Sequence, residues 1–244
     1  MHNTMQNTLN NALVFYSRIP DIHLEGKTRI GKIIENQTIA NELARSLILD
    51  MLTLYGTFPQ RNYDLIFFHK GHRGNFVPPK NCKVEKFIPQ IEDTLPINMQ
   101  FIQEQMLNDY KKVIIVGSDI PLLHPKRICK AFKKLDHYDM VFNPVEDGGY
   151  CLVGMKEPHD IYSSITNWNS HTEGYHLFEQ TLEIINSLGL KIYSLKKIYD
   201  IDLLEDVQNL WKTITYKNEL EKKYSYLPLT YMHLLNNGKI YKLF

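Results

Sequence analysis

The stretch Val113-Ile114-Ile115-Val116-Gly117-Ser118-Asp119-Ile120-Pro121 decides the fold class of this 244-residue chain. Its first four residues are apolar and mostly β-branched, which is typical of a strand buried on both faces in the middle of a parallel sheet. Asp119 follows the carboxyl end of that strand. Ligands of open α/β sheets bind in the crevice outside these ends, so the position favours a chemical role for Asp119. A turn or helix-capping aspartate is the alternative interpretation.

Strands and helices are predicted to alternate along the rest of the chain. Short apolar runs separate segments whose apolar residues recur at helical spacing. Such alternation is typical of an α/β fold with a mostly parallel central sheet and helices on both faces. The expected strands are 12–16, 64–68, 84–88, 113–116, 140–142, 150–155 and 191–194, and the expected helices are 38–55, about 98–107, one that begins at Pro125, and 174–186. Residues 18–32 are expected to form a basic loop.

The length is sufficient for one large α/β core, and no Pro/Gly/Ser-rich linker divides the chain. We expect a polar, Asn-rich and disordered N-terminus over residues 1–11, a single domain over 12–213 and a C-terminal extension over 214–244. The extension mixes lysines with tyrosines and leucines. Such a segment packs on its own domain, covers a sheet edge, packs on a partner subunit of a homo-oligomer or approaches a membrane surface; packing on its own domain is the favoured interpretation.

Composition excludes several classes of function. The chain has 28 basic and 27 acidic residues, so no broad charge attracts nucleic acid or an anionic membrane. Its three cysteines have no metal-like spacing, and their odd number argues against a disulfide framework. We find neither a signal peptide nor an apolar run long enough to span a bilayer. The sequence therefore predicts a cytoplasmic protein without a transmembrane segment.

Four motifs occur in the order and spacing of one protein family. They are Gly26–Arg29, Gly117–Leu123, Glu146–Tyr150 and Asp200–Asp206. With them the chain resembles the bacterial DUF2064 family, glycosyltransferase-A-like proteins associated with radical-SAM and selenium-related domains. That family is similar to the phospholactate and molybdenum-cofactor guanylyltransferases. The resemblance extends from about Ala12 to Lys212.

The resemblance implies a nucleotide-diphospho-sugar transferase fold of the Rossmann-like GT-A type and a metal-dependent transfer at a nucleotide phosphate. It also implies that Asp147, Gly148 and Gly149 line the active site, and Trp168 matches a family tryptophan near the acceptor. In one respect this chain departs from the family. Residues 21–25 lengthen the loop before the Lys-Thr-Arg motif, which leaves the loop geometry open.

The first chemical candidate is the loop with Arg18, Gly26, Lys27, Thr28 and Arg29. A reaction that breaks a phosphoanhydride must offset the negative charge that grows on the leaving group, and loop cations do this well. We assign that catalytic role to Lys27 and Arg29. Glycine allows the backbone to approach phosphate oxygens, so Gly26, Thr28 and Arg18 are assigned to substrate binding. A solvated basic loop is the alternative.

The second candidate is a metal site at Asp119. Mg²⁺ takes a few carboxylate oxygens and completes its shell with water and substrate phosphates, so two aspartates from separate strand ends would suffice. Asp200 and Asp202 are the candidate partners. Asp202 has a competing interpretation as a helix N-cap, because Glu205 follows three residues later in a capping-box pattern. We expect Mg²⁺ or Mn²⁺ on Asp119 and Asp200, and Asp202 is equally suited to metal binding and capping.

The third candidate is the acidic, glycine-rich segment from Glu146 to Gly149. Its glycines permit a turn against which a sugar or acceptor can lie, and Glu146 and Asp147 can bind hydroxyl groups. A tight hairpin turn is the alternative, and both can hold together. Ser118 and Trp168 complete the residues assigned to substrate binding.

Three functions are compatible with these residues. The first is nucleotidyl transfer from a nucleoside triphosphate to a small phosphorylated or carboxylated acceptor, with release of pyrophosphate. The second is glycosyl transfer from a nucleoside-diphosphate-sugar, and the third is nucleotide binding without turnover. The basic loop favours the first. Many metal-dependent glycosyltransferases carry Asp-x-Asp after this strand, whereas here Ser118 replaces the first aspartate.

Overall fold

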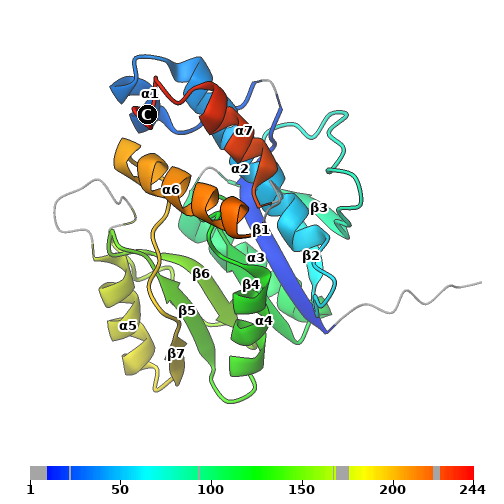
Figure 1. The fold of residues 1–244 in the computed structure, drawn as a ribbon. Coiled ribbons are helices and arrows are strands. Elements are labelled where there is room, and N and C mark those ends of the chain that lie inside the picture. Colours follow the sequence, from blue (N-terminus) through cyan, green and yellow to red (C-terminus); the bar gives the residue numbers. More distant parts are fainter. Residues whose placement is uncertain (1–9, 22, 93, 167, 169–175, 222–225) are drawn as a thin grey trace, which may run out of the picture.

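Seven strands form one sheet in the computed structural model, which describes residues 10–21, 23–92, 94–166, 168, 176–221 and 226–244. The strands follow the order β3-β2-β1-β4-β6-β5-β7 across the sheet (Figure 1). Their bounds are β1 Asn11–Arg18, β2 Asp64–Lys70, β3 Lys86–Pro89, β4 Lys112–Val116, β5 Met140–Pro144, β6 Tyr150–Met155 and β7 Ile192–Ser194. The helices are α1 Thr28–Ile33, α2 Gln37–Gly56, α3 Leu95–Asp109, α4 Pro125–Lys134, α5 Leu177–Ser187, α6 Leu204–Glu221 and α7 Pro228–Asn236.

The sheet is mostly parallel, and β4 is its central strand. β1 pairs in parallel with β2 and β4, β2 with β3, and β5 with β7. β6 alone runs antiparallel, between β4 and β5. β4 lies between β1 and β6, and its side chains belong to the apolar clusters on both faces of the sheet. All four residues from Val113 to Val116 are therefore buried. The fold class predicted from this stretch is confirmed.

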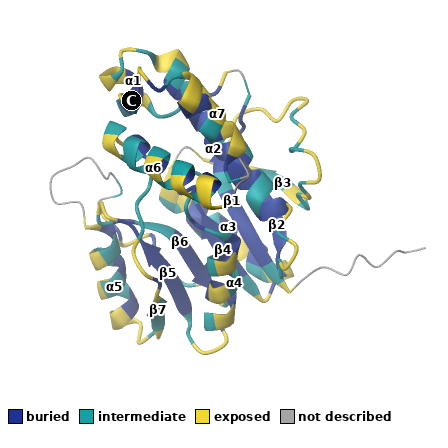
Figure 2. Cartoon of the chain, in the orientation of Figure 1, coloured by how far each residue is buried: buried dark blue, intermediate teal, exposed yellow. Residues whose placement is uncertain are grey.

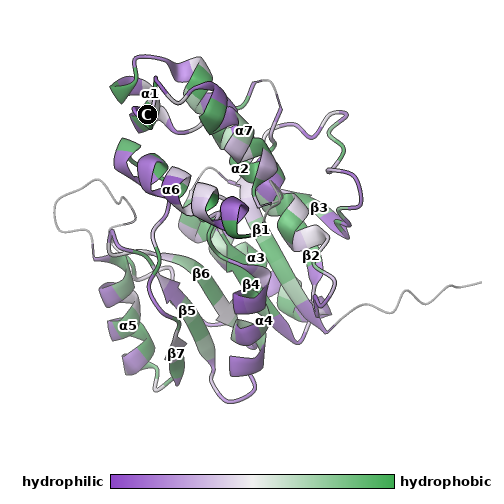
Figure 3. Ribbon diagram, viewed as in Figure 1, coloured by the Kyte–Doolittle hydropathy of each residue, from purple (hydrophilic) through white to green (hydrophobic). Residues whose placement is uncertain are grey.

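Helices cover both faces of the sheet, because side chains alternate between the faces along each strand. On one face, Leu13 and Phe15 of β1 pack with α2 and α4. On the other face, Ala12 and Val14 pack with α3 and α5. The central strands are accordingly buried and apolar along their length (Figures 2 and 3).

A third apolar cluster lies where α1, α2, α6 and α7 meet (Figure 1). This cluster includes Leu43 and Leu47 of α2, Val207 and Leu210 of α6, and Leu234 of α7. The C-terminal residues that the structure describes therefore pack on the same domain, and α6 runs across the domain limit expected at residue 213. Among the helices described, none combines the length and the apolar character needed to cross a membrane.

The local structure differs from expectation at several segments. Residues 28–32 of the expected basic loop belong to helix α1, which ends at Ile33, and α6 and α7 were not among the expected helices. The helix expected over 174–186 is observed from Leu177 to Ser187, and residues 174 and 175 lie outside the described part of the chain. Of the N-terminus expected to be disordered, residues 1–9 also lie outside it, whereas Asn11 already begins β1.

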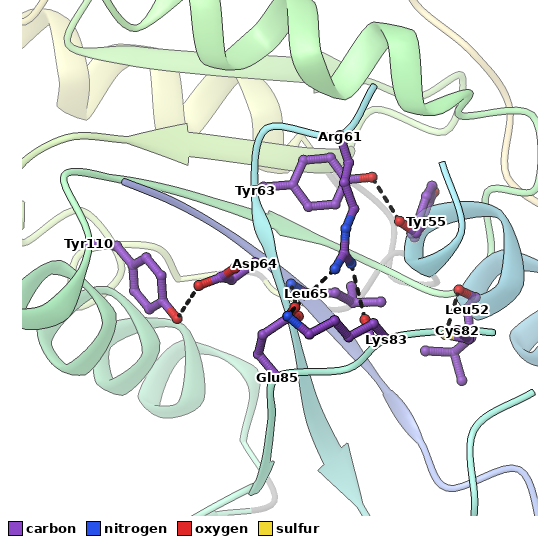
Figure 4. Close-up of polar contacts among 10 residues, drawn as sticks. All are labelled: Leu52, Tyr55, Arg61, Tyr63, Asp64, Leu65, Cys82, Lys83, Glu85 and Tyr110. Carbon is purple, nitrogen blue, oxygen red and sulfur yellow. Dashed lines mark hydrogen bonds and ion pairs between the residues drawn. The ribbon is translucent and has the colours of Figure 1, made fainter. Parts of the chain in front are cut away.

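A polar network ties β2 and β3 to the loops at their start (Figure 4). Arg61 forms a 2.9 Å ion pair with Glu85 and also donates to the Lys83 carbonyl. The other Glu85 oxygen accepts the Leu65 N–H at 2.8 Å. Nearby, the buried Tyr63 hydroxyl donates to the Tyr55 carbonyl at the end of α2. These bonds satisfy polar groups that the sheet edge would otherwise leave unpaired.

Asp50, a buried carboxylate on α2, caps helix α7. Its two oxygens accept the backbone N–H groups of Leu229 (3.2 Å) and Thr230 (2.8 Å), where α7 has no helical partners for them. Burial raises the pKa of Asp50 to about 6, and these hydrogen bonds reduce the shift without cancelling it. The docking of α7 therefore places a carboxyl group in apolar surroundings.

We predict that Asp50 makes the protein less stable as the pH rises from about 4 to about 6. The folded state binds more protons than the unfolded chain in that window, because the folded pKa lies above the ordinary value of 3.8. Urea unfolding of the wild type and of Asp50→Asn at pH 4 and pH 7 measures it. From pH 4 to pH 7 the wild type should lose roughly 2–3 kcal/mol of unfolding free energy relative to Asp50→Asn. A difference that is independent of pH would contradict the prediction.

Candidate active site

A cleft of about 640 Å³ opens at the carboxyl ends of β1, β2 and β4. It reaches both faces of the sheet, since its lining includes Ala44 and Ile48 of α2 and Met99 of α3. The predicted residues that line it are Arg18, Gly26, Lys27, Thr28, Arg29, Ser118, Asp119, Trp168 and Asp202. This edge is where the topology of an open α/β sheet places a ligand site.

Gly26 brings the basic loop close against α2. A Cβ atom at this position would lie 2.7 Å from Cβ of Ala44, so only glycine fits without a shift. The Gly26 N–H donates to Asn41 Oδ1 at 3.0 Å, and its carbonyl accepts from Gln37 Nε2 at 2.9 Å. The next residue, Lys27, adopts the left-handed conformation (φ 52°) and α1 begins directly after it. The loop is therefore held at Gly26, two residues before the helix begins.

The Lys27 side chain points into the carboxylates rather than into solvent. Its ammonium lies 2.9 Å from Oδ1 of Asp119 and 3.5 Å from Oδ1 of Asp202, and it also donates to the carbonyl of Ile201. Only 5% of the side chain is exposed. Burial alone would lower the pKa of Lys27, but the charges of Asp119, Asp202 and Asp200 raise it above its ordinary value. Lys27 is thus charged and held by carboxylates, whereas from the sequence we assigned it to the charge of the leaving group.

Asp200 lies next to this cluster but does not line the cleft. Burial raises the pKa of its carboxyl to about 7, and the negative charges of Asp202, Asp147 and Asp119 contribute to the shift. The charges of these four aspartates therefore act on one another. A cluster of this kind favours a bound cation, because added positive charge relieves the repulsion between the carboxylates.

Asp202 does not form the expected capping box with Glu205. Asp206 takes that role, since its Oδ2 accepts the N–H groups of Asp202 (3.0 Å) and Leu203 (2.7 Å). The side chain of Asp202 instead contacts Lys27 and lies 3.3 Å from Nη2 of Arg29. The capping signal was real, but the acceptor is one residue later, where the chain enters α6.

The residues fit a hard divalent cation. Asp119 and Asp202 each present an oxygen to the same ammonium, so both carboxylates face one cationic centre. No group of three or more His, Cys, Asp or Glu side chains in the described part of the chain is arranged to hold a metal. Two carboxylates with water and phosphate oxygens match the coordination that Mg²⁺ takes in phosphate-transfer sites. Asp202, and not Asp200, is the one that shares a partner with Asp119.

The acidic segment 146–149 forms the hairpin turn between β5 and β6. The Val145 N–H donates to the Gly149 carbonyl at 3.0 Å, the Gly149 N–H donates to Asp147 Oδ1 at 2.9 Å, and Gly148 has a φ of 95°. None of Glu146, Asp147, Gly148 and Gly149 is among the residues that line the cleft. The next two residues, Tyr150 and Cys151, do line it. The turn therefore positions Tyr150 and Cys151 at the cleft. The negative charge of Asp147 helps to raise the pKa of Asp200.

Sequence reasoning missed Lys70 and Gln90, which also line the cleft. Lys70 ends β2 in register with Arg18 at the end of β1, so parallel pairing alone would have brought the two together. Gln90 follows β3, and its N–H donates to the His69 carbonyl at 2.8 Å. Lys70 is visible in the sequence as a lysine near the end of an apolar run, but the strand pairing that brings it to the cleft is not.

The wall beside Gln90 is shaped by Asn98, a fully buried polar residue of α3. Its amide oxygen accepts from the Ile91 N–H, and its amide nitrogen donates to the carbonyls of Glu92 and Thr94 and to the hydroxyl of Tyr16. Tyr16 lines the cleft. Trp168 lines it as well, with its indole N–H held by the Ile165 carbonyl at 3.0 Å.

Comparison with solved structures shows which class of fold this is. A candidate nucleotide-diphospho-sugar transferase from Desulfovibrio desulfuricans G20 is similar over 96% of this chain and 98% of its own, with a TM-score of 0.78 and 23% identity. A cytidylyltransferase from Leptospira borgpetersenii serovar Hardjo-bovis is similar over 95% and 96%, with a TM-score of 0.50 and 16% identity. The chain therefore has the fold of nucleotide-dependent transferases.

A family model matches part of the sequence. Residues 60–170 match the family described as "Uncharacterized protein conserved in bacteria (DUF2064)", which confirms the predicted resemblance over this segment. No protein of curated function matches the sequence.

We predict that Gly26→Ala lowers the free energy of unfolding by about 1–3 kcal/mol, since the new methyl group would overlap the Ala44 side chain of α2. Urea denaturation measures the change. Ala44→Gly in the same chain is the matched control, because it removes the atom that clashes. The double variant should therefore lose less stability than the sum of the single variants. Additive losses would show that the close approach of Gly26 to α2 does not matter.

Proposed function

We propose that this protein is a nucleotidyltransferase that moves a nucleoside monophosphate from a nucleoside triphosphate to a small phosphorylated or carboxylated acceptor. One observation carries the proposal. Four of the residues that line the cleft are lysine or arginine, and two of them, Lys27 and Arg29, form ion pairs with the carboxylates of Asp119 or Asp202. A triphosphate needs both features, because it brings a large negative charge together with a divalent cation.

The reaction is a displacement at the α-phosphorus. An acceptor oxygen forms a bond to that atom, the bond to the bridging oxygen breaks, and the electron pair leaves with pyrophosphate. The residues of the cleft stabilise the charge that grows on the leaving group. Arg29, which is 37% exposed, and Arg18 at the end of β1 can reach phosphate oxygens from the cleft wall, and arginine can bind them with two parallel hydrogen bonds.

Asp119 and Asp202 would hold Mg²⁺ or Mn²⁺ at this site, with Asp200 beside them. The metal would supply Lewis-acid stabilisation of the phosphate charge. Asp119 is well placed to bind it, since 52% of its side chain is exposed to the cleft while its backbone is fixed. That backbone is held by the Ile201 N–H, which donates to the Asp119 carbonyl at 2.9 Å. Trp168 and Tyr150 would face the acceptor.

Glycosyl transfer is the second candidate, favoured by the description of the similar Desulfovibrio protein as a candidate nucleotide-diphospho-sugar transferase. It would use the same cleft with a sugar-nucleotide donor. Against it stands Ser118, because a second carboxylate is lacking where many metal-dependent glycosyltransferases have Asp-x-Asp. A screen with Mg²⁺ or Mn²⁺ separates the two functions. It scores pyrophosphate release from each triphosphate and diphosphate release from each sugar donor, over a panel of acceptors.

We predict that Asp119→Asn lowers pyrophosphate release by at least about 100-fold without unfolding the protein, because it removes a charge at constant shape. Steady-state assays with Mg²⁺ measure the rate, and circular dichroism checks the fold. Asp109→Asn is the matched control, since Asp109 is an exposed aspartate on α3 that pairs with Lys86 away from the cleft. Unchanged turnover in Asp119→Asn would remove Asp119 from the mechanism.

We also predict that Arg29→Ala weakens the binding of a nucleoside triphosphate by about tenfold, and that of a diphosphate-sugar by less. A triphosphate has more charge for the guanidinium to offset. Calorimetric titrations with both ligands measure the ratio, and Arg45→Ala on the exposed side of α2 is the control. Equal losses for the two ligands would favour glycosyl transfer.

A further inference from the structure

Three oxygen atoms surround the ammonium group of Lys27. A lysine has three N–H donors and no acceptor. The Ile201 carbonyl accepts one of them, Oδ1 of Asp119 lies 2.9 Å away, and Oδ1 of Asp202 forms a longer ion pair at 3.5 Å. The side chain is almost fully buried, although it lines the cleft. Lys27 therefore occupies the centre on which the two carboxylates converge.

A divalent cation held between Asp119 and Asp202 would lie next to this ammonium, because both carboxylates face it. At Oδ1 of Asp119 the two would compete, since their positive charges repel each other. Arg29 does not compete in the same way, since it approaches the other oxygen of Asp202, Oδ2. The competition is thus specific to Lys27.

The long side chain of Lys27 can leave the carboxylates without a change of backbone. Its backbone is fixed, because the Lys27 carbonyl accepts the Gly31 N–H of α1 at 2.9 Å and the neighbouring Gly26 is held to α2. A change of side-chain rotamers would turn the ammonium further into the cleft, which Lys27 already lines, without moving these hydrogen bonds. In the cleft, phosphate groups of a nucleotide offer the negative charge that the ammonium gives up.

We propose that Lys27 is a built-in counter-cation of the Asp119–Asp202 pair, which a divalent metal ion must displace before it can bind. This inference rests on the proposed function, because it assumes a metal at Asp119. Its consequence is that metal and nucleotide bind with positive coupling. The metal frees Lys27 for the phosphates, and the phosphates stabilise Lys27 away from the carboxylates.

The test uses Mn²⁺ alone, titrated into the full chain and followed by the electron paramagnetic resonance signal of free Mn²⁺. Lys27→Met keeps an unbranched side chain and removes the charge. We expect it to bind Mn²⁺ at least tenfold more tightly than the wild type, and Asp119→Asn in the same chain should abolish the tight binding. Equal or weaker binding by Lys27→Met would overturn the inference.

A second measurement works on the wild type, in case Lys27→Met fails to fold. Acetylation by acetic anhydride, read residue by residue in a mass spectrometer, reports how accessible each lysine is. Saturating Mn²⁺ should speed the acetylation of Lys27 severalfold relative to Lys83, a reference side chain that is 72% exposed. A ratio unchanged by Mn²⁺ would overturn the inference.

The two failures are distinguishable. If Mn²⁺ binds through Asp119 with the same affinity in the wild type and in Lys27→Met, the counter-cation role is wrong. The metal site of the proposed function then stands. If Asp119→Asn does not change Mn²⁺ binding in either background, the metal site itself is wrong, and the inference fails with it.

Discussion

The ion pairs of Lys27 with Asp119 and Asp202 are the interaction on which the cleft depends. They join three segments that are far apart in the sequence: the start of α1, the loop after β4 and the chain before α6. The bond from Lys27 to the Ile201 carbonyl and the bond from the Ile201 N–H to Asp119 close the same junction. Because burial weakens solvation of the ammonium, these partners together offset the cost of burying its charge.

Helix α2 links this junction to the two cores on its sides. Ile48 and Met51 pack toward the sheet, whereas Leu43 and Leu47 pack toward α6 and α7. Ala44 sets how closely the basic loop can approach, and Asp50 anchors α7 through its first backbone N–H groups. One amphipathic helix therefore fixes both the position of the loop and that of the C-terminal helix.

Much of the fold was predictable because its signals are local. The apolar run of β4, the helical spacing of α2 and the extent of β6 each lie within a few consecutive residues, and the structure reproduces them. The site was predictable in its residue types but not in its pairings. Lys27 was assigned to phosphate, whereas the structure places it against carboxylates. Asp202 was split between capping and metal binding, whereas Asp206 makes the capping bonds.

The sequence by itself determined the class of fold and the edge of the sheet where the site lies, since periodicity and the position of Asp119 after a buried strand are properties of short segments. Only the tertiary structure decided which charges neutralise one another. It brought Lys70 beside Arg18 through the register of β1 and β2, left Glu146 to Gly149 outside the cleft lining, and buried Lys27 between Asp119 and Asp202. The physical reason is that an ion pair depends on distances of a few ångströms between residues more than 80 positions apart in the chain, which local sequence does not encode.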